Sequence, residues 1–395
     1  MSAAGEVAPL NRKAAVRFIV CLGVVSLFAD MTYEGARSIL GPFLSELGAS
    51  AAQVGIIAGV GEMLAASLRY FSGRFADKTR AYWPIALSGY ALNILVVPAL
   101  AFVHSWQAAA LLVAAERAGK SLRGPARDVL LSEATEVVGH GFGFGVHAMF
   151  DQAGAVIGPL MMAAAVAQLN HFGPAFLRLG LPALGAVIAL LVARHMRPVQ
   201  AVPPPSKGTQ VLPKVFWYYV AAAGILAAGF LDFPLMAYHF QKTHIITPAA
   251  IPLLYAVAMA VTGLSALLYG WLFDRWGILV LVVGIFISLL ALPLGFLGGR
   301  LGAMAAVVCW GAGLGVQDAS LRAGIAQVVS MNKRGGAFGS FNAVYGVMWF
   351  AGSAAMGLLY DRSVMGLVVF GVVAQLIAAG MFVALRRPLV AARHA

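Results

Sequence analysis

Charged side chains are the scarcest feature of this sequence. Asp, Glu, Lys and Arg make up 11% of its 395 residues, whereas hydrophobic residues make up 61%. The mean hydropathy is +0.87. Soluble globular domains carry about 25% charged residues, so this composition excludes that class and predicts a polytopic membrane protein. With so little polar sequence, we expect no soluble domain large enough for an enzyme.

Motifs for catalysis and metal binding are also missing. The two cysteines, Cys21 and Cys309, each sit inside an apolar run, where a thiol usually behaves as a small buried hydrophobe. The sequence contains no phosphate-binding P-loop, no His-Glu-x-x-His and no Gly-x-Ser-x-Gly. We therefore expect no cofactor, no resident metal and no nucleotide hydrolysis.

Long apolar runs fill most of the sequence instead. No strand-like alternation competes with them, and the 45 glycines suit the close packing of membrane helices. Each run is long enough to cross a hydrocarbon core of ~30 Å as a helix. The predicted fold class is therefore an all-α polytopic membrane protein with about twelve transmembrane helices. The runs fall near 14–41, 50–72, 82–103, 106–131, 140–168, 173–194, 214–240, 248–270, 278–299, 301–329, 336–358 and 363–385.

The net charge of +12 has a characteristic placement. Most cations, among them Arg12, Arg74, Lys214 and Arg386, lie at ends and loops of one parity. By the positive-inside rule, this predicts that both termini and the loop around 195–214 face the cytoplasm, in a multi-pass protein of the cytoplasmic (inner) membrane. Juxtamembrane cations would then contact anionic lipid, and no nucleic-acid partner is expected.

A short charged motif occurs twice where an apolar run stops. Residues 73–78 read Gly-Arg-Phe-Ala-Asp-Lys and residues 270–275 read Gly-Trp-Leu-Phe-Asp-Arg. Near the same offset, Phe-Ala-Asp at 28–30 aligns with Phe-Leu-Asp at 230–232. An internal repeat of this kind predicts two related, pseudo-symmetric halves. We expect an N-terminal six-helix bundle over 1–197, a cytoplasmic linker over 198–214 and a C-terminal six-helix bundle over 215–395.

The repeated motif resembles the loop between helices two and three of the major facilitator superfamily of secondary transporters, Gly-x-Leu-Ala-Asp-Arg/Lys-x-Gly-Arg. Arg117 resembles the helix-four arginine of its proton-coupled members. In helix five, Gly145, Gly154, Gly158 and Pro159 resemble the antiporter motif of its exporters. The resemblance implies the major facilitator fold, with a cytoplasmic gate at Gly73, Asp77, Lys78, Arg80, Gly270, Asp274 and Arg275.

Charges inside the apolar spans mark the predicted substrate cavity. Asp30, Glu34 and Arg37 share one helix face. A lipid-facing Asp at mid-bilayer costs about 2.5–3.5 kcal/mol on insertion scales, so this face should turn to protein or water. Structural ion pairs are the alternative, and Glu62 is equally open to pairing with an arginine or contacting substrate. The predicted cavity residues are Asp30, Glu34, Arg37, Arg117, Lys120, Arg123, Asp232, His239, Asp318 and Arg322.

These features together predict a secondary transporter that works by alternating access, with proton-coupled antiport as the expected mode. Asp30 or Asp151 would exchange the proton and Arg117 would set its affinity, because a dry carboxylate holds its proton more tightly and an approaching arginine favours release. Asp151 is equally open to a structural role beside an arginine.

Other interpretations remain open at this point. They are a proton-coupled symporter or passive facilitator for a small anionic or zwitterionic metabolite and, more distantly, an intramembrane enzyme. The acidic residues would also admit a cation or cationic drug, whereas a metal ion is a minority option because no dense His/Met/Cys array is present. The expected partners are a small-molecule substrate, protons and membrane lipids, and the chain is expected to be a monomer.

Overall fold

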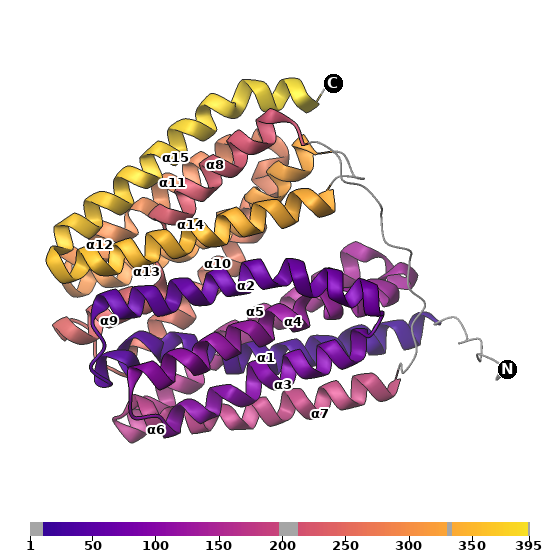
Figure 1. Cartoon of the computed structure of the whole chain (residues 1–395), viewed down its shortest axis with the longest axis horizontal. Coiled ribbons are helices and arrows are strands. Elements are labelled where there is room, and N and C mark those ends of the chain that lie inside the picture. The colour runs from indigo at the N-terminus through magenta and orange to yellow at the C-terminus, as the bar shows by residue number, and fades with distance from the viewer. Residues whose placement is uncertain (1–10, 197–211, 330–333, 394–395) are drawn as a thin grey trace.

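The structure, a computed structural model, describes residues 11–196, 212–329 and 334–393. In these ranges it is helical and has no strands (Figure 1). The predicted all-α polytopic fold is confirmed. The first six passes are α1 (Arg12–Glu46), α2 (Ala51–Thr79), α3 (Tyr82–Ala99) with η1 (Leu100–Phe102), α4 (Trp106–Val138), α5 (His140–Leu169), and α6 (Phe172–Ala175) with η2 (Phe176–Leu179) and α7 (Gly180–Met196).

The second six passes follow the predicted linker, most of which lies outside the described residues. Eleven segments of the described chain are long and apolar enough to cross a membrane, and α4 is the remaining pass, set apart by its many charged residues. The second set is α8 (Lys214–Gly229) with α9 (Phe233–Thr243), α10 (Ala250–Trp276), α11 (Leu279–Leu289) with α12 (Ala291–Leu297), α13 (Gly299–Val328), α14 (Arg334–Arg362) and α15 (Val364–Arg393).

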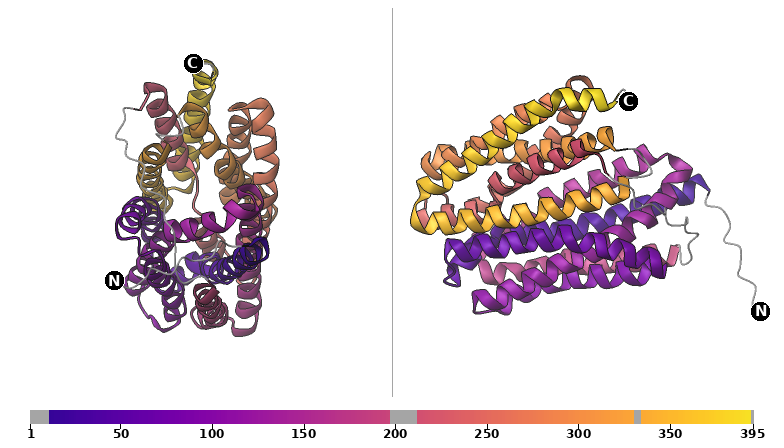
Figure 2. Two further views of the ribbon diagram at one scale, coloured as in Figure 1. Left: turned by 90° about the vertical axis from the view of Figure 1, so that its right-hand side faces the viewer. Right: turned by 45° about the horizontal axis from the view of Figure 1, so that its top comes forward.

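Helices α1 to α7 lie together, and α8 to α15 lie beside them, in all three views (Figures 1 and 2). Because each group makes an even number of passes, the start of α1, the end of α7, the start of α8 and the end of α15 lie at one end of the molecule. We call this the terminal end. The opposite end, where α1 leads into α2 and α14 leads into α15, is called the far end.

The two groups pack most closely toward the far end. Gly41 of α1 lies against the backbone of Pro234 in α9, and Gly59 of α2 lies against Phe350 of α14. Small residues allow membrane helices to approach at backbone distance. Toward the terminal end, nothing from another element lies within 4 Å of the Cβ position of Gly145 in α5 or Gly270 in α10. The molecule is thus closed at the far end.

The pass formed by α8 and α9 is broken in the middle, which the single predicted run over 214–240 did not anticipate. Phe230 and Asp232 have extended backbone, and Pro234 opens α9. A break at membrane depth frees carbonyl groups that must be satisfied within the protein. The Gln375 amide donates to the Gly229 carbonyl at 3.0 Å, and the Trp310 indole donates to the Leu231 carbonyl at 2.7 Å. These bonds hold Asp232 at the joint.

The repeated charged motif is helical in both places, whereas we expected a turn at its first occurrence. Residues 73–79 are the last turns of α2, which ends at Arg80 with a left-handed φ of 54°. Residues 270–276 are likewise the last turns of α10. Continuing the helix satisfies the backbone of a segment that leaves the apolar region. Both copies lie at the terminal end.

Candidate functional site

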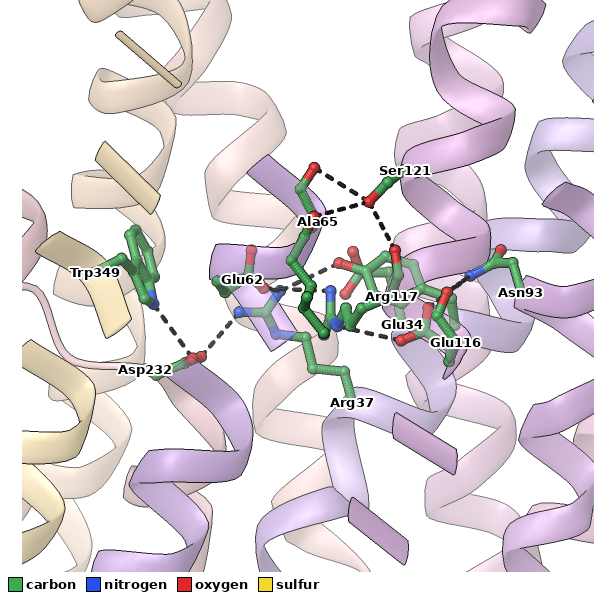
Figure 3. A network of polar contacts seen from close by, with 12 residues as sticks. Glu34, Arg37, Glu62, Ala65, Asn93, Glu116, Arg117, Ser121, Asp232 and Trp349 are labelled. Atoms are coloured by element: carbon green, nitrogen blue, oxygen red, sulfur yellow. Dashed lines mark hydrogen bonds and ion pairs between the residues drawn. The ribbon is translucent and has the colours of Figure 1, made fainter. Parts of the chain in front are cut away.

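A chain of alternating charges crosses the centre of the molecule (Figure 3). The Arg37 guanidinium lies 2.8 Å from Asp232 and 2.9 Å from Glu62. Glu62 also accepts Arg117 at 3.2 Å, and Arg117 lies 3.1 Å from Glu116. Asp232 is 1% exposed and Arg117 5%, whereas the Glu62 side chain between them is 24% exposed, so the ends of this chain of charges are buried and its centre is partly open. We call these five residues the central network.

The central network joins the two groups of helices. Arg37, Glu62, Glu116 and Arg117 come from α1, α2 and α4, whereas Asp232 comes from the joint between α8 and α9. Further bonds hold it in place. The Trp349 indole donates to Asp232 at 3.3 Å, the Asn93 amide donates to Glu116 at 2.6 Å, and the Tyr255 hydroxyl donates across the halves to Glu34 at 2.6 Å.

A second charged cluster lies on α1, α4 and α5, separate from the contact between the halves. Arg123 donates to Asp30 at 3.2 Å and lies over the Tyr90 ring at 4.5 Å. His147 lies 3.3 Å from Asp151, which also has Arg127 at 3.9 Å. Ser26 of α1 is hydrogen-bonded to His147 and accepts from Arg127, which connects α1 to this group. Arg127 also pairs with Asp128 at 2.8 Å. We call it the α5 cluster.

The glycine motif of helix five explains how the α5 cluster forms. Gly154 lies against the Leu27 carbonyl, and Gly158 lies against the Met31 carbonyl, so α5 runs at backbone distance along α1. This contact brings Asp151 beside the α1 face that carries Asp30. Pro159 lies inside α5 next to this seam, and Gly145 lies beyond it toward the terminal end.

Several predicted cavity residues stay outside the central network. The Lys120 ammonium lies 3.4 Å above the Tyr33 ring and has no carboxylate within 4.0 Å in the described chain. Asp318 and Arg322 of α13 are exposed and form no ion pair with each other or with another described residue. The ion pair suggested by their spacing is therefore absent.

His239 belongs to a different environment. Its Nδ1 atom is hydrogen-bonded to the Tyr360 hydroxyl at 2.9 Å, and its ring packs against Phe296. His239 lies two turns into α9, between Asp232 and the far end of the molecule, within an aromatic cluster. His239 and Arg37 occupy equivalent positions in the internal repeat, but only Arg37 belongs to the central network.

The predicted gate residues lie at the terminal end. Lys78, Arg80 and Asp274 are exposed, and the Arg275 guanidinium stacks on the Trp271 ring of its own helix at 3.7 Å. Gly73 lies against Pro125 of α4. The side chain of Asp77 falls outside the described residues. Lys78, Arg80 and Asp274 have no ion pair with the opposite half in the described part of the chain.

Two carboxylates of the central network were left open or overlooked by sequence reasoning. Glu62 pairs with two arginines, the alternative to direct substrate contact. Glu116 is bonded by Asn93 from α3, a helix that looks almost featureless in sequence. In the sequence, the polar Asn93 inside the apolar run over 82–103 indicates such a contact. A small pocket between α1, α3 and α4 borders this end of the network at Arg37, Glu116 and Arg117.

None of the described residues forms a group of three or more His, Cys, Asp and Glu side chains that could hold a metal ion. The arrangement is instead one of carboxylates held by arginines, histidine and aromatic hydroxyls. Such groups can bind protons and the polar ends of a small solute, and they can exchange partners when the helices that carry them move.

Comparison with known proteins finds a family model and relatives that each match most of the chain. The chain matches the model of the Major Facilitator Superfamily over residues 22–353. An uncharacterized protein of Mycobacterium tuberculosis is 40% identical over 99% of this chain and 100% of its own length. An uncharacterized MFS-type transporter of Methanocaldococcus jannaschii is 25% identical over 87% of this chain and 89% of its own.

Solved structures share the fold. A bacterial homolog of the human lysosomal transporter Spinster, inward-facing and occupied, has a TM-score of 0.74 at 13% identity, with 96% of this chain and 98% of that chain covered. The nucleoside transporter NupG has a TM-score of 0.67 at 15% identity, with 95% and 98% covered. The family match, the helical fold and the buried charges agree: this chain belongs to the Major Facilitator Superfamily, and it is a multi-pass membrane transporter and not an enzyme.

Proposed function

We propose that this secondary transporter is a proton-coupled antiporter that exports a small solute across the cytoplasmic (inner) membrane. The observation that carries the proposal is the α5 cluster. It places Asp30 and Asp151 on neighbouring helices, each held by a cation of α4 or α5, along the glycine seam that resembles exporters. We propose protons as the coupling ion because carboxylates inside membrane-spanning helices can bind and release protons.

Proton exchange follows from the partners of the two carboxylates. An arginine close to a carboxylate favours the ionised form, and withdrawal of the arginine in a dry site favours proton binding. Arg123 plays this part for Asp30, while Arg127 and His147 play it for Asp151. Arg117, the residue expected to set proton affinity, instead contacts Glu62 and Glu116. A shift of α4 against α1 would therefore act on Asp30 through Arg123.

Coupling to the solute runs through the central network. Arg37 and Asp232 belong to different halves, as do Tyr255 and Glu34. Opening the far end separates the halves and breaks these contacts, so a solute that replaces them there changes the balance between the two states. The substrate cavity then lies between the central network and the terminal end, bounded by Lys120, Asp318 and Arg322.

The proposed orientation places the terminal end in the cytoplasm, with both termini on that side. It is supported by the concentration of Lys and Arg at this end, which would also contact anionic lipid. The far-end packing then makes this state open toward the cytoplasm. Asp77 and Asp274 would stabilise the alternative state, in which the terminal end closes. We propose that the monomer is the transporting unit, because each chain carries both halves.

Replacing the carboxylates of the α5 cluster tests the coupling. A vesicle screen against metabolites and drugs first identifies a transported solute. We then expect Asp30→Asn or Asp151→Asn to abolish pH-driven accumulation while retaining counterflow, since counterflow needs no net proton movement. The matched control is Glu136→Gln, because Glu136 is exposed near the terminal end of α4 and belongs to neither the α5 cluster nor the central network.

The result for the two variants decides the role of each carboxylate. Loss of accumulation with retained counterflow in one variant identifies that residue as the coupling group. Unchanged pH-driven accumulation in both variants would show that neither carboxylate couples transport to protons. The direction of solute movement under a fixed pH gradient distinguishes antiport from symport.

A second candidate is symport or facilitated passage of a zwitterionic metabolite. Lys120 of α4 and Asp318 of α13 lie on opposite halves, and neither has an ion-pair partner within 4.0 Å among the described residues. A solute with a carboxylate and an ammonium group would contact both side chains at once. In the vesicle assay, a symporter would accumulate this solute along with protons, and a facilitator would only equilibrate it.

A further inference from the structure

The charged motif of the terminal end has a third copy at the far end of α14. Residues 357–362 read Gly-Leu-Leu-Tyr-Asp-Arg, and residues 270–275 of α10 read Gly-Trp-Leu-Phe-Asp-Arg. These two copies share Gly first, Leu third, an aromatic residue fourth, then Asp and Arg, whereas all three copies share Gly first, Asp fifth and a cation sixth. The first copy, at 73–78, lies in α2. The third copy thus stands at the opposite end of the molecule from the other two.

The position of the third copy follows from the topology. Within each half of this fold, two sets of three passes are related by inverted repeats. Helix α10 is the middle pass of the set α8–α12, and α14 is the middle pass of the set α13–α15. Inversion therefore relates the terminal end of α10 to the far end of α14. A motif at one is expected to have its counterpart at the other.

In this structure the third copy contacts the other half. One carboxylate oxygen of Asp361, Oδ1, accepts from the Ala51 backbone N–H at 3.2 Å, and Oδ2 accepts from the Ala52 N–H at 2.9 Å. These are the first two donors of α2. Ser50 and Gln53 form a capping box that satisfies each other's N–H groups. Asp361 thus completes the cap, and its charge suits the positive end of the helix dipole.

Gly357 makes this contact possible. It lies one turn before Asp361, and its backbone lies directly against Ala51 and Ala52. A side chain at this position would meet the Ala51 carbonyl and hold α14 away from α2. Among the described residues, the second copy makes no such contact: nothing from another element lies within 4 Å of the Gly270 Cβ position, and Asp274 forms no hydrogen bond or ion pair with the other half.

We propose that Gly357 and Asp361 form a latch that holds the far end closed. Because α2 and α14 belong to different halves, the contact breaks whenever the far end opens, which leaves two backbone donors of α2 and the Asp361 carboxylate without their partners. The inference rests on the proposed alternating access and goes beyond it, because the gate predicted from the motif lies only at the terminal end. The latch works by backbone capping and needs no side-chain cation.

Spin-label distances across the far end test the latch. Glu46→Cys and Ser363→Cys place labels on exposed residues of the two halves, in a full-length chain with Cys21 and Cys309 replaced by Ser. In lipid nanodiscs, Asp361→Asn should raise the ratio of open to closed distances roughly tenfold, because a charged hydrogen-bond acceptor is lost.

A second variant removes the contact from the other side. Ala51→Pro deletes one of the two donors while Asp361 stays intact, and proline is tolerated at the first position of a helix. The preceding Ser50 already has the extended backbone that proline requires. We expect a similar opening. The double variant should open no further than Asp361→Asn alone, because both changes remove one shared contact.

Arg362→Gln is the matched control, since it changes the charge of the adjacent exposed residue and should leave the distances as in the parent chain. Unchanged distances in both Asp361→Asn and Ala51→Pro would overturn the latch, as would equal opening by Arg362→Gln. Failure of alternating access itself is a different result: the parent chain would then show one distance at every pH and solute concentration.

Discussion

The two halves of this transporter hold their polar groups in different ways. Of the eight ion pairs within 4.0 Å in the described chain, seven join residues of α1–α7 and one, Arg37 with Asp232, joins the halves. The described part of α8–α15 contains none of its own. It has neutral bonds such as Tyr345 to Gln317 at 2.8 Å, and ring contacts around Trp310.

This difference arose within a repeated architecture. Asp30, Glu34 and Arg37 have register partners Asp232, Met236 and His239, yet only Asp232 retains a charge that faces the centre. Charged groups that pair within one half can exchange protons without moving the other half. In the proposed mechanism, the second half, which has no ion pair of its own among the described residues, transmits its position to the first through Asp232. In the proposed mechanism, the division of roles between the halves rests on the Arg37–Asp232 contact.

The largest effect should come from breaking that contact. Arg37→Ala leaves Asp232 buried without its cation, which typically costs about 3–5 kcal/mol when one partner of a buried pair is removed. We expect a large drop in the melting temperature of the purified protein and loss of transport. Both are measured on the same preparation, by thermal unfolding and by solute flux in vesicles.

Two further variants sharpen this result. Arg178→Ala removes an exposed arginine at the far end and should change neither measurement. The double variant Arg37→Met with Asp232→Asn removes both charges and should recover most of the stability without recovering transport. Recovery of transport would contradict the view that this contact signals between the halves.

A smaller effect is expected from the neutral half. Trp310→Phe keeps an aromatic ring but removes the donor to the Leu231 carbonyl at the α8–α9 joint. Leaving a buried carbonyl without a partner costs about 1–3 kcal/mol. Thermal unfolding measures the loss, with Trp217→Phe at the exposed start of α8 as the control. A loss as large as that of Arg37→Ala would remove the contrast between the halves.

The smallest effect on stability should come from the terminal-end motifs. Asp77→Asn and Asp274→Asn form a matched pair, one in each half, and each changes a single polar side chain near a helix end. Asp274 is exposed, and exposed substitutions usually stay within about 0.5 kcal/mol. We nevertheless expect both to shift accessibility toward the cytoplasm-open state, because each removes a carboxylate proposed to stabilise terminal-end closure. Cysteine accessibility from the two sides of the membrane reports the shift. Wild-type accessibility in both variants would refute the gate.

The sequence predicted the fold far better than the partners within the site. Twelve passes follow from long apolar runs, which depend only on composition and length. The face shared by Asp30 and Arg37 follows from helical spacing, and both residues do lie among charges. That Arg123 contacts Asp30 while Arg117 contacts Glu62 depends on the rotation and depth of α4, which spacing within one helix does not specify.

The broken pass shows the same limit. Pro234 carried a local signal that a helix starts near it, but the apolar run continues across residues 229–234 and hides the break. The partners that stabilise the break, Trp310 and Gln375, come from passes 79 and 146 residues away along the chain. Contacts of this range have no signature in a local window of sequence.

The joint between α8 and α9 also sets where the molecule can bend. The α9 segment packs chiefly against α1 of the opposite half, with Gly41 against Pro234 and Arg37 bonded to Asp232. It is connected to α8 by three non-helical residues, of which Phe230 and Asp232 are extended. When the far end opens, α9 can move either with α8 of its own half or with α1 of the opposite half. The joint therefore gives the seventh pass a non-helical point inside the membrane at which α9 can turn relative to α8.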